Sequence, residues 1–362
     1  MTALKQRISD LIAATGPISV ADYMALCLFH PEHGYYTTRE PFGVAGDFTT
    51  APEIGQMFGE LVAVWLYDCW TAMERPPGAV LAEIGPGRGT LMKDIVRTLH
   101  KLAPAFVRQT RFELVETSPR LREIQRATLA DSLPDFAWHE SVATLPAGPL
   151  FIVGNELFDA LPVRQFVKTN AGWRERVVGL SENGELRFMA GASGLDPALL
   201  PADAQSAAEG AVFEIAPARE ALMETIAERI SRTGGAGLFF DYGHVKAGVG
   251  DTLQAVRGHR YDDVLAHPGE ADITSHVDFA RLAQAAKLHG LSAPLMTQGD
   301  FLIEQGLLQR AGSLGAGKDE ATQQRLRDEV ERLAGPDQMG RLFKVLALLP
   351  RGLTVFPFPP AD

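Results

Sequence analysis

A glycine-rich segment beside a carboxylate is the part of the sequence best suited to binding a ligand. Residues 81–90 read LAEIGPGRGT, with glycines at Gly85, Gly87 and Gly89 and an acid at Glu83. An apolar run precedes the segment and a helical pattern follows it, so we expect a turn from a strand into a helix N-terminus. Glycines let the backbone approach a ligand closely, and the helix N-terminus offers unpaired N–H groups and partial positive charge.

Two positions in this turn distinguish two kinds of cofactor. The dinucleotide fingerprint G-x-G-x-x-G would need glycine at Thr90, and Glu83 would repel a pyrophosphate. An acid at Glu83 can instead hold the ammonium of a methionine moiety, directly or through water. Glu116, at the end of the next expected strand, can accept hydrogen bonds from both ribose hydroxyls. The pattern favours S-adenosylmethionine over a nicotinamide dinucleotide; a ligand-free Gly-Pro-Gly turn with Glu116 in solvent is the alternative.

A second group of polar residues follows the fourth expected strand. Asn155 and Glu156 come directly after the apolar run LFIVG, and Asp159 follows three residues after Glu156. Carboxylates can orient a guanidinium through paired hydrogen bonds and accept a proton as a methyl group arrives. A negative site also offsets the repulsion between a sulfonium donor and a cationic acceptor. We therefore expect these three residues to be catalytic, with helix capping and surface charge as the alternative reading.

Weaker signals mark further cofactor contacts. Thr50 and Glu53 have the spacing of a helix capping box, and the loop that contains them can also fold over a cofactor. Ser141 and Val142 follow the third expected strand and are candidates for adenine contacts, or residues of a plain loop. No His, Cys, Asp or Glu cluster has metal-ligand spacing, so we expect no metal.

The surrounding elements predict an α/β fold. Strands are expected over 79–85, 111–116, 135–141, 149–156 and 235–243, and helices over 90–102, 119–129 and 218–231. Short apolar strands that alternate with helices are typical of a parallel sheet covered on both faces.

Two stretches interrupt this alternation. The distance between the fourth and fifth strands is too long for one crossover, and its alternating pattern predicts an inserted β-meander at about 163–215. We expect a second insertion, a helical cap, at about 244–290. The interpretation is a helical arm with a cofactor-covering loop over 1–75 and a catalytic domain over 76–362.

Composition excludes several classes of protein. The 362 residues carry 34 Lys and Arg against 45 Asp and Glu, a formal net charge of −11, so binding of nucleic acid through its phosphates is not expected. Two cysteines without paired spacing fit a reducing compartment. No apolar run is long enough to span a bilayer, and no signal peptide is evident, so we expect a cytoplasmic protein without membrane insertion.

Several ordered blocks make the sequence resemble a known family. GDFTTAPE (46–53), FGE (58–60), the glycine-rich turn, ELVETSP (113–119), GNELFDALPV (154–163) and the run from GDTLQAVRGH to HPGEADITSHVDF are similar to the MidA-like family. Its mitochondrial members are assembly factors of respiratory complex I.

The resemblance implies a fold, a cofactor and a reaction. The fold is a class I, Rossmann-like methyltransferase with a seven-stranded sheet, and the cofactor is S-adenosylmethionine. The reaction is symmetric dimethylation of an arginine in a complex I subunit of the iron–sulfur arm, or of another protein. A non-catalytic S-adenosylmethionine-binding assembly factor is the alternative function.

Overall fold

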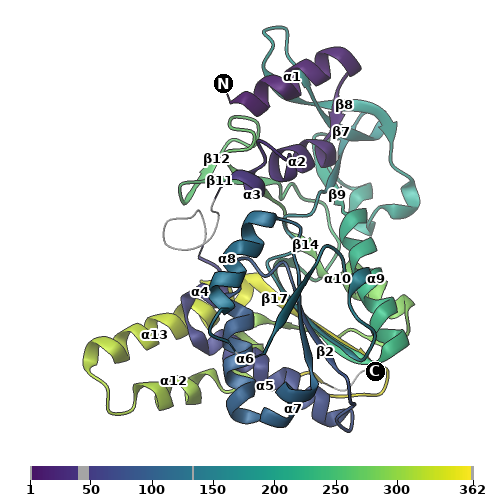
Figure 1. Ribbon diagram of the computed structural model, residues 1–362. Coiled ribbons are helices and arrows are strands. Elements are labelled where there is room, and N and C mark those ends of the chain that lie inside the picture. Colours follow the sequence, from purple (N-terminus) through teal and green to yellow (C-terminus); the bar gives the residue numbers. More distant parts are fainter. Residues whose placement is uncertain (1, 40–48, 133, 360–362) are drawn as a thin grey trace. The chain divides into compact units, whose positions relative to one another are not determined.

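The computed structural model describes residues 2–39, 49–132 and 134–359, which form two compact units. The first unit combines Met1–Phe48, Phe158–Ala221 and His244–Asp278, and the second combines Thr49–Leu157, Leu222–Gly243 and Phe279–Asp362. Both expected insertions overlap the first unit, together with the N-terminal segment. The proposed division at residue 75 groups the chain differently and stays a prediction. Figure 1 shows the elements of both units.

The second unit is built on a mainly parallel sheet. Its hydrogen-bonded path runs β15-β17-β10-β5-β2-β3-β4. The strands are β2 (Val80–Ile84), β3 (Arg111–Val115), β4 (Phe136–His139), β5 (Leu150–Asn155), β10 (Gly235–His244), β15 (Leu291–Ser292) and β17 (Phe343–Pro350). All five expected strands are present and pair in parallel, whereas β17 is antiparallel to β10. The α/β class is confirmed; the count of seven strands is not, because β16 (Leu295–Thr297) also pairs with β17.

Helices enclose this sheet, and its interior strand β2 is buried along its whole length. They are α5 (Gln56–Ala72), α6 (Thr90–Leu102), α7 (Pro104–Gln109), α8 (Pro119–Leu129), α9 (Pro217–Thr233) and α10 (Phe279–Leu288). Helix α5 packs against α6, and its Phe58 meets Phe240 of β10 edge to face, with ring centroids 4.8 Å apart. Helices α6 and α8 begin and end where the sequence predicts.

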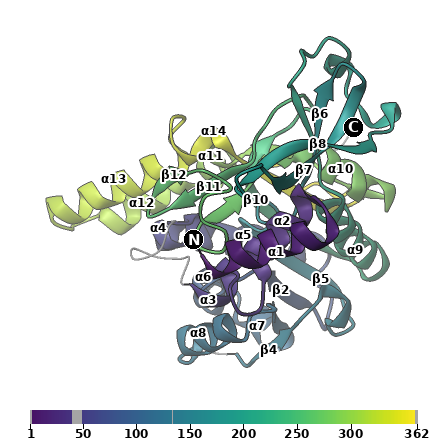
Figure 2. The same cartoon turned by 90° about the horizontal axis from the view of Figure 1, so that it is seen from above.

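A helical segment between β16 and β17 completes the second unit. It contains α11 (Gln298–Glu304), α12 (Leu307–Gly315), α13 (Glu320–Ala334) and α14 (Met339–Leu342). Helices α12 and α13 lie side by side in both views (Figures 1 and 2). Arg310 of α12 donates through Nε and Nη2 to the two oxygens of Glu60 on α5, at 2.7 and 2.9 Å. This bidentate pair ties the segment to the helix layer.

The first unit combines N-terminal helices with inserted strands. Helices α1 (Ala3–Thr15), α2 (Val20–Phe29) and α3 (Tyr35–Thr38) share an apolar core with residues of both insertions. The predicted meander is present as β6 (Arg164–Thr169), β7 (Gly172–Leu180), β8 (Leu186–Gly194) and β9 (Val212–Ile215), and β1 (Ile18–Ser19) adds to β7.

The second insertion ends in a helix as expected, α10, but the rest of it is not the helical cap that the sequence predicts. It contains a three-stranded antiparallel sheet of β11 (Gln254–Arg257), β12 (Arg260–Asp262) and β13 (Asp272–Thr274). Helix α10 belongs to the second unit. Gly258 and His259, both with positive φ, form the turn of the β11–β12 hairpin, which a helix could not accommodate.

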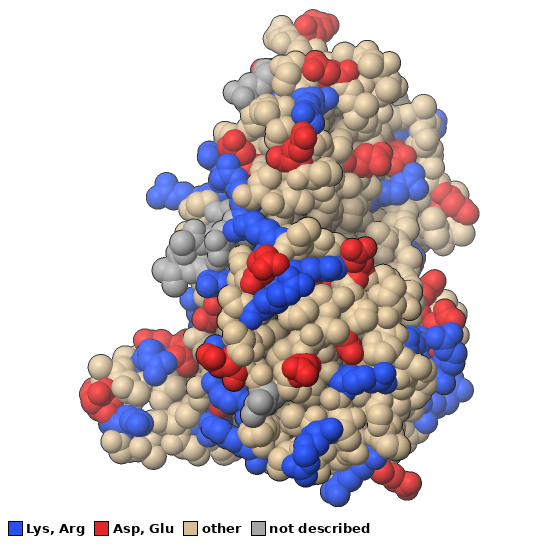
Figure 3. Space-filling model, viewed as in Figure 1, with Lys and Arg blue, Asp and Glu red and all other residues tan. Residues whose placement is uncertain are grey.

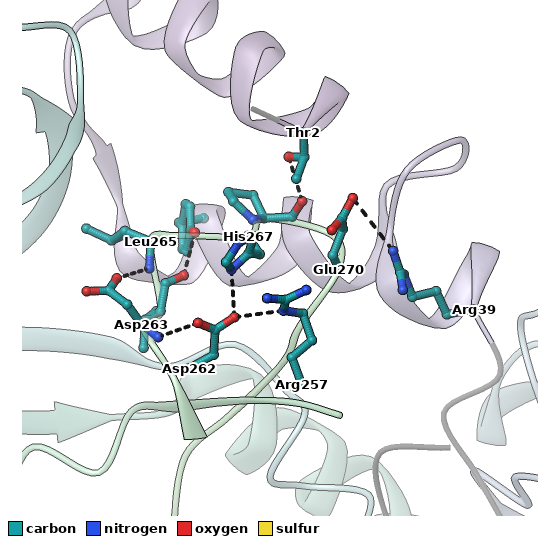
Figure 4. A network of polar contacts seen from close by, with 11 residues as sticks. Thr2, Arg39, Arg257, Asp262, Asp263, Leu265, His267 and Glu270 are labelled. Carbon is teal, nitrogen blue, oxygen red and sulfur yellow. Dashed lines mark hydrogen bonds and ion pairs between the residues drawn. The ribbon is translucent and has the colours of Figure 1, made fainter. Parts of the chain in front are cut away.

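A polar network joins distant segments of the first unit (Figure 4). Asp262 accepts hydrogen bonds from Arg257 Nε at 3.1 Å and contacts His267 Nδ1 at 2.7 Å. Burial alone would raise the pKa of Asp262, but the hydrogen bonds from His267, Arg257 and the Asp263 N–H outweigh it and lower the pKa. The Thr2 hydroxyl donates to the Pro268 carbonyl at 3.0 Å. The contacts of Asp262 thus fix the loop of the second insertion, and the Thr2 hydrogen bond links that loop to the N-terminal segment.

Two adjacent glycines at the start of β10 give a matched test of this fold. Gly234 and Gly235 both have positive φ, of 76° and 117°. A Cβ at Gly234 meets nothing within 4 Å, whereas one at Gly235 would lie 1.9 Å from the Leu150 carbonyl oxygen of β5. We expect Gly234→Ala to cost about 1–2 kcal/mol of unfolding free energy from backbone strain. Gly235→Ala should cost roughly 1–3 kcal/mol more, because β5 and β10 must separate.

Chemical unfolding of the two variants, monitored by circular dichroism, measures this difference. Equal losses for Gly234→Ala and Gly235→Ala would contradict the close approach of β5 and β10.

Candidate functional site

The glycine-rich turn lies where β2 ends and α6 begins, as the sequence predicts. Gly85, Gly87 and Gly89 all have positive φ, of 66°, 51° and 84°. Gly89 is the N-cap of α6 and no side chain caps this end of the helix. A Cβ on Gly85 would come within 3.0 Å of Leu157. The turn therefore requires glycine for its backbone conformation and presents the positive end of a 13-residue helix.

Glu83 is buried on β2 with one oxygen unsatisfied. The residue is 2% exposed, and its Oε2 has no hydrogen-bond partner. Burial raises the pKa of Glu83 well above the usual value, and a hydrogen bond from the Met92 N–H lowers it only in part. A buried acceptor without a donor is costly. A cationic or hydrogen-donating ligand group at this oxygen would remove that cost.

Glu116 follows β3 and is held in one orientation. Its Oε1 accepts from the Ser118 N–H at 2.8 Å, and its Oε2 accepts from Gln125 Nε2 at 3.3 Å. Burial raises its pKa, which the hydrogen bonds from Ser118 and Gln125 counteract in part. Sequence reasoning missed Gln125, because a glutamine inside a charged helix carries no signal of its partners.

The capping box expected at Thr50 and Glu53 does not form. Thr50 precedes α4 (Ala51–Ile54) as its N-cap, but its side chain makes no capping hydrogen bond. The Glu53 carboxylate instead accepts from the Thr90 hydroxyl at 2.5 Å. Because Thr90 is the first residue of α6, this contact brings Glu53 to the glycine-rich turn, and only the tertiary fold offers Glu53 that partner.

Ser141 and Val142 lie just after β4. The Ser141 hydroxyl accepts from the Ala143 N–H at 3.2 Å and caps a short 3-10 helix, Val142–Thr144. Ser141 is exposed, whereas Val142 is 2% exposed. Their expected adenine contacts stay a prediction.

Asn155 and Glu156 lie at the carboxyl end of β5. Asn155 Nδ2 donates to Glu156 Oε1 at 3.0 Å, and its buried Oδ1 has no hydrogen-bond partner. Glu156 has φ of 51°, an uncommon conformation for a residue with a Cβ, while its N–H bonds to the Phe240 carbonyl at 2.9 Å. Backbone strain of this kind clusters at functional sites. The arrangement offers an amide oxygen for a donor and a carboxylate at the same sheet edge.

Asp159 belongs to the first unit and is 6% exposed. Its Oδ1 accepts from the Ala160 N–H at 2.8 Å. Arg219, 2% exposed, donates to the carbonyls of Asp159 and Leu161 at 3.1 and 3.0 Å, and also to the Ser275 hydroxyl. Arg219 therefore fixes the backbone at Asp159, a positioning role that the sequence does not reveal.

A tyrosine and an aspartate lie in the same unit as Asp159. The Tyr36 hydroxyl donates to the two oxygens of Asp272 at 3.1 and 3.2 Å. Burial, followed by the charges of Asp272 and Asp159, raises the pKa of Tyr36 well above its usual value. The phenol therefore stays protonated and remains a hydrogen-bond donor.

Neither a patch of one charge on the face in Figure 3 nor a metal centre accompanies these residues in the part of the chain that the structure describes. Acidic and basic side chains are interspersed on the face drawn in Figure 3. Among the described residues, no group of three or more His, Cys, Asp or Glu side chains is placed to hold a metal ion. The helices in these described ranges all lack an apolar stretch of the length that a membrane span requires.

Curated relatives match almost the entire chain. The Mus musculus and Homo sapiens proteins named "Protein arginine methyltransferase NDUFAF7, mitochondrial" are 36% and 35% identical, over 97% of this chain and 85% and 84% of theirs. A Drosophila melanogaster homologue is 34% identical, over 96% of this chain and 85% of its own length. All three names contain the word mitochondrial, which contradicts the expected cytoplasmic location.

Two solved structures from Burkholderia thailandensis share the fold at 28% identity. One is bound to S-adenosylhomocysteine and aligns with a TM-score of 0.81, over 96% of this chain and 92% of that chain. The other is a native crystal structure that aligns with a TM-score of 0.79, over 96% of this chain and 91% of that chain. The Rossmann-like methyltransferase fold and the S-adenosylmethionine cofactor are confirmed.

A family model identifies the group to which the chain is related. The model described as "Putative S-adenosyl-L-methionine-dependent methyltransferase" matches residues 61–297. The match includes the glycine-rich turn, Glu116 and the end of β5. By this match and its full-length relatives, the chain belongs to this family of S-adenosylmethionine-dependent methyltransferases.

Proposed function

We propose that this methyltransferase transfers the methyl group of S-adenosylmethionine to an arginine of a protein substrate. The observation that carries the proposal is the pair at the end of β5, where Asn155 has an unsatisfied buried oxygen and Glu156 is held with strained backbone. Full-length relatives that are named protein arginine methyltransferases support the choice of acceptor.

The residues around the glycine-rich turn fit the cofactor. The unsatisfied Glu83 oxygen would face the ammonium of the methionine moiety, and Glu116 would accept from the ribose hydroxyls. Gly85, Gly87 and Gly89 would let the backbone approach, while Thr50, Glu53, Ser141 and Val142 are further candidates for the cofactor's surroundings. When bound, S-adenosylmethionine supplies a methyl group on an electrophilic sulfonium.

Residues after β5 would orient and neutralise the acceptor. An arginine guanidinium has only donors, so the Asn155 Oδ1 and the Glu156 carboxylate are suitable partners. The carboxylate would hold the guanidinium by charge-assisted hydrogen bonds and take up the proton that the nitrogen loses. Asp159 follows on the same loop and remains the third candidate. The protein's contribution is thus chiefly orientation and electrostatic stabilisation.

The substrate is best sought among subunits of respiratory complex I. The family resemblance implies a subunit of its iron–sulfur arm, and the relatives' names give arginine as the methylated residue. Purified protein incubated with labelled S-adenosylmethionine and extract from cells that lack it tests this directly, with mass spectrometry of methylarginine peptides. Binding of S-adenosylhomocysteine without methylarginine formation would contradict the enzyme proposal and favour a non-catalytic assembly factor.

Replacing the Glu156 carboxylate should separate catalysis from cofactor binding. Glu156→Gln keeps the shape but removes the charge that neutralises the acceptor, so we expect kcat to fall roughly 10²–10⁴-fold. The affinity for S-adenosylhomocysteine should stay within about threefold, because the proposed cofactor ligands are intact. Methyl transfer rates and calorimetry measure both quantities.

Glu123→Gln is the control, because Glu123 is an acid with a 73% exposed side chain that pairs with Arg126 on the surface of α8. A Glu156→Gln enzyme as active as the Glu123→Gln enzyme would remove Glu156 from the mechanism.

Cofactor binding should release protons through Glu83. Burial raises the pKa of Glu83, and a neighbouring ammonium would lower it again, so a proton leaves when the cofactor binds. Affinity should therefore increase as pH rises toward the pKa of Glu83 in the free protein. Calorimetry in buffers of different ionisation heats detects the released proton, and Glu83→Gln should abolish that part of the release.

Glu113→Gln provides the comparison, because Glu113 is also buried in the sheet but pairs with His139 at 2.8 Å. A proton release that is the same in Glu83→Gln as in the wild type would exclude Glu83 as its source.

A further inference from the structure

Gln125 connects three parts of the second unit that come from different elements. The residue lies on α8 and is fully buried, with 0% exposure. Its Nε2 donates to the Gly87 carbonyl at 2.9 Å and to Glu116 Oε2 at 3.3 Å, and its Oε1 accepts from Trp138 Nε1 at 2.9 Å. One side chain thus contacts the glycine-rich turn, the carboxylate after β3 and strand β4.

The chemistry of these partners fixes the orientation of the amide. An indole N–H can only donate, so the Gln125 oxygen must face Trp138. The two N–H bonds of the amide then meet two acceptors, the Gly87 carbonyl and the Glu116 carboxylate. A flipped amide would place its NH2 against the indole N–H and its oxygen against both acceptors. The Gln125 side chain is therefore held in one arrangement with its two donors used.

The backbone supports the same close packing. Helix α8 contacts α6, and a Cβ on Gly89 would lie 3.6 Å from the Gln125 Cα. The glycine-rich turn therefore packs directly on the segment of α8 that carries Gln125.

We propose that Gln125 is a positioning residue for the cofactor: its amide fixes the Glu116 carboxylate relative to the glycine-rich turn. This inference rests on the cofactor-binding roles proposed above for Glu116 and the turn. Both groups must be placed correctly at once, because they would hold the ribose and the methionine portion of a single molecule. Gln125 acts on the cofactor through these groups and not by touching it.

Calorimetry with S-adenosylhomocysteine tests this role without any methyl acceptor. Gln125→Met keeps a similar shape and removes both donors without adding charge. We expect the Kd for S-adenosylhomocysteine to rise about tenfold, as for loss of a hydrogen bond to a charged group. Once a methyl acceptor is known, the KM of Gln125→Met for S-adenosylmethionine should rise, while its kcat at saturation should stay near the wild-type value. A Kd within twofold of the wild type would overturn the proposal.

A double-mutant cycle distinguishes positioning from general packing. In the Glu116→Gln background, the effect of Gln125→Met should fall to less than about threefold, since the positioned carboxylate is gone. An undiminished tenfold effect there would also overturn the proposal. Trp138→Phe, which removes only the contact that orients the amide, should weaken binding less than Gln125→Met does.

A second variant keeps the proposal testable if the Gln125→Met protein does not fold. Gln125→Asn keeps an amide that is too short to reach both acceptors, and it should show the same loss of affinity. Binding of S-adenosylhomocysteine needs no methyl acceptor, so this test remains valid even if the protein does not methylate arginine. Conversely, an unchanged Kd in the Gln125 variants would not contradict the proposed arginine methylation.

Discussion

The parallel register of strands β2, β3 and β5 is the constraint on which the site depends. Ile84 pairs with Val115 on one side and with Gly154 on the other, so the three strands end within one residue of the same level. Glu116 and Asn155 each stand one residue beyond these positions, and the glycine-rich turn begins there too. A strand in a sheet that is buried on both faces cannot slide along its neighbour without breaking all the backbone hydrogen bonds between the two strands. This edge of the sheet is therefore a rigid support.

This rigidity keeps polar groups in places where they are costly. Glu83 and Asn155 each have a buried oxygen without a donor, and Glu156 keeps a strained backbone. Burial of apolar side chains in the surrounding core offsets the destabilising effect of these features. In that core, α5, α6 and the sheet bury large aromatic side chains such as Phe58 and Phe151. Preorganisation of this kind lowers the cost of ordering polar groups when a ligand binds, in keeping with the cofactor roles proposed above for these residues.

Helix α8 shows how a neighbouring element secures this edge. Its N-cap Ser118 donates its N–H to Glu116, and Gln125, seven residues on, donates to the same carboxylate from inside the helix. Arg122, between them, donates to the Glu116 carbonyl at 2.8 Å. The N-cap and two residues of α8 therefore hold both the side chain and the backbone of Glu116. Their hydrogen bonds keep its carboxylate at the sheet edge.

Elements with local signals could be predicted from the order of residues alone. Apolar runs predicted the five parallel strands, helical periodicity predicted α6 and α8 to the residue, and glycine spacing located the turn at Gly85, Gly87 and Gly89. Which side chains contact one another depends on the folded arrangement of the elements. Glu53 accepts a hydrogen bond from Thr90 instead of forming the expected capping box. Gln125 forms hydrogen bonds with Gly87, Glu116 and Trp138. These partners are distant in sequence, and a side chain's hydrogen bonds depend on which groups folding places within reach, which no local pattern encodes.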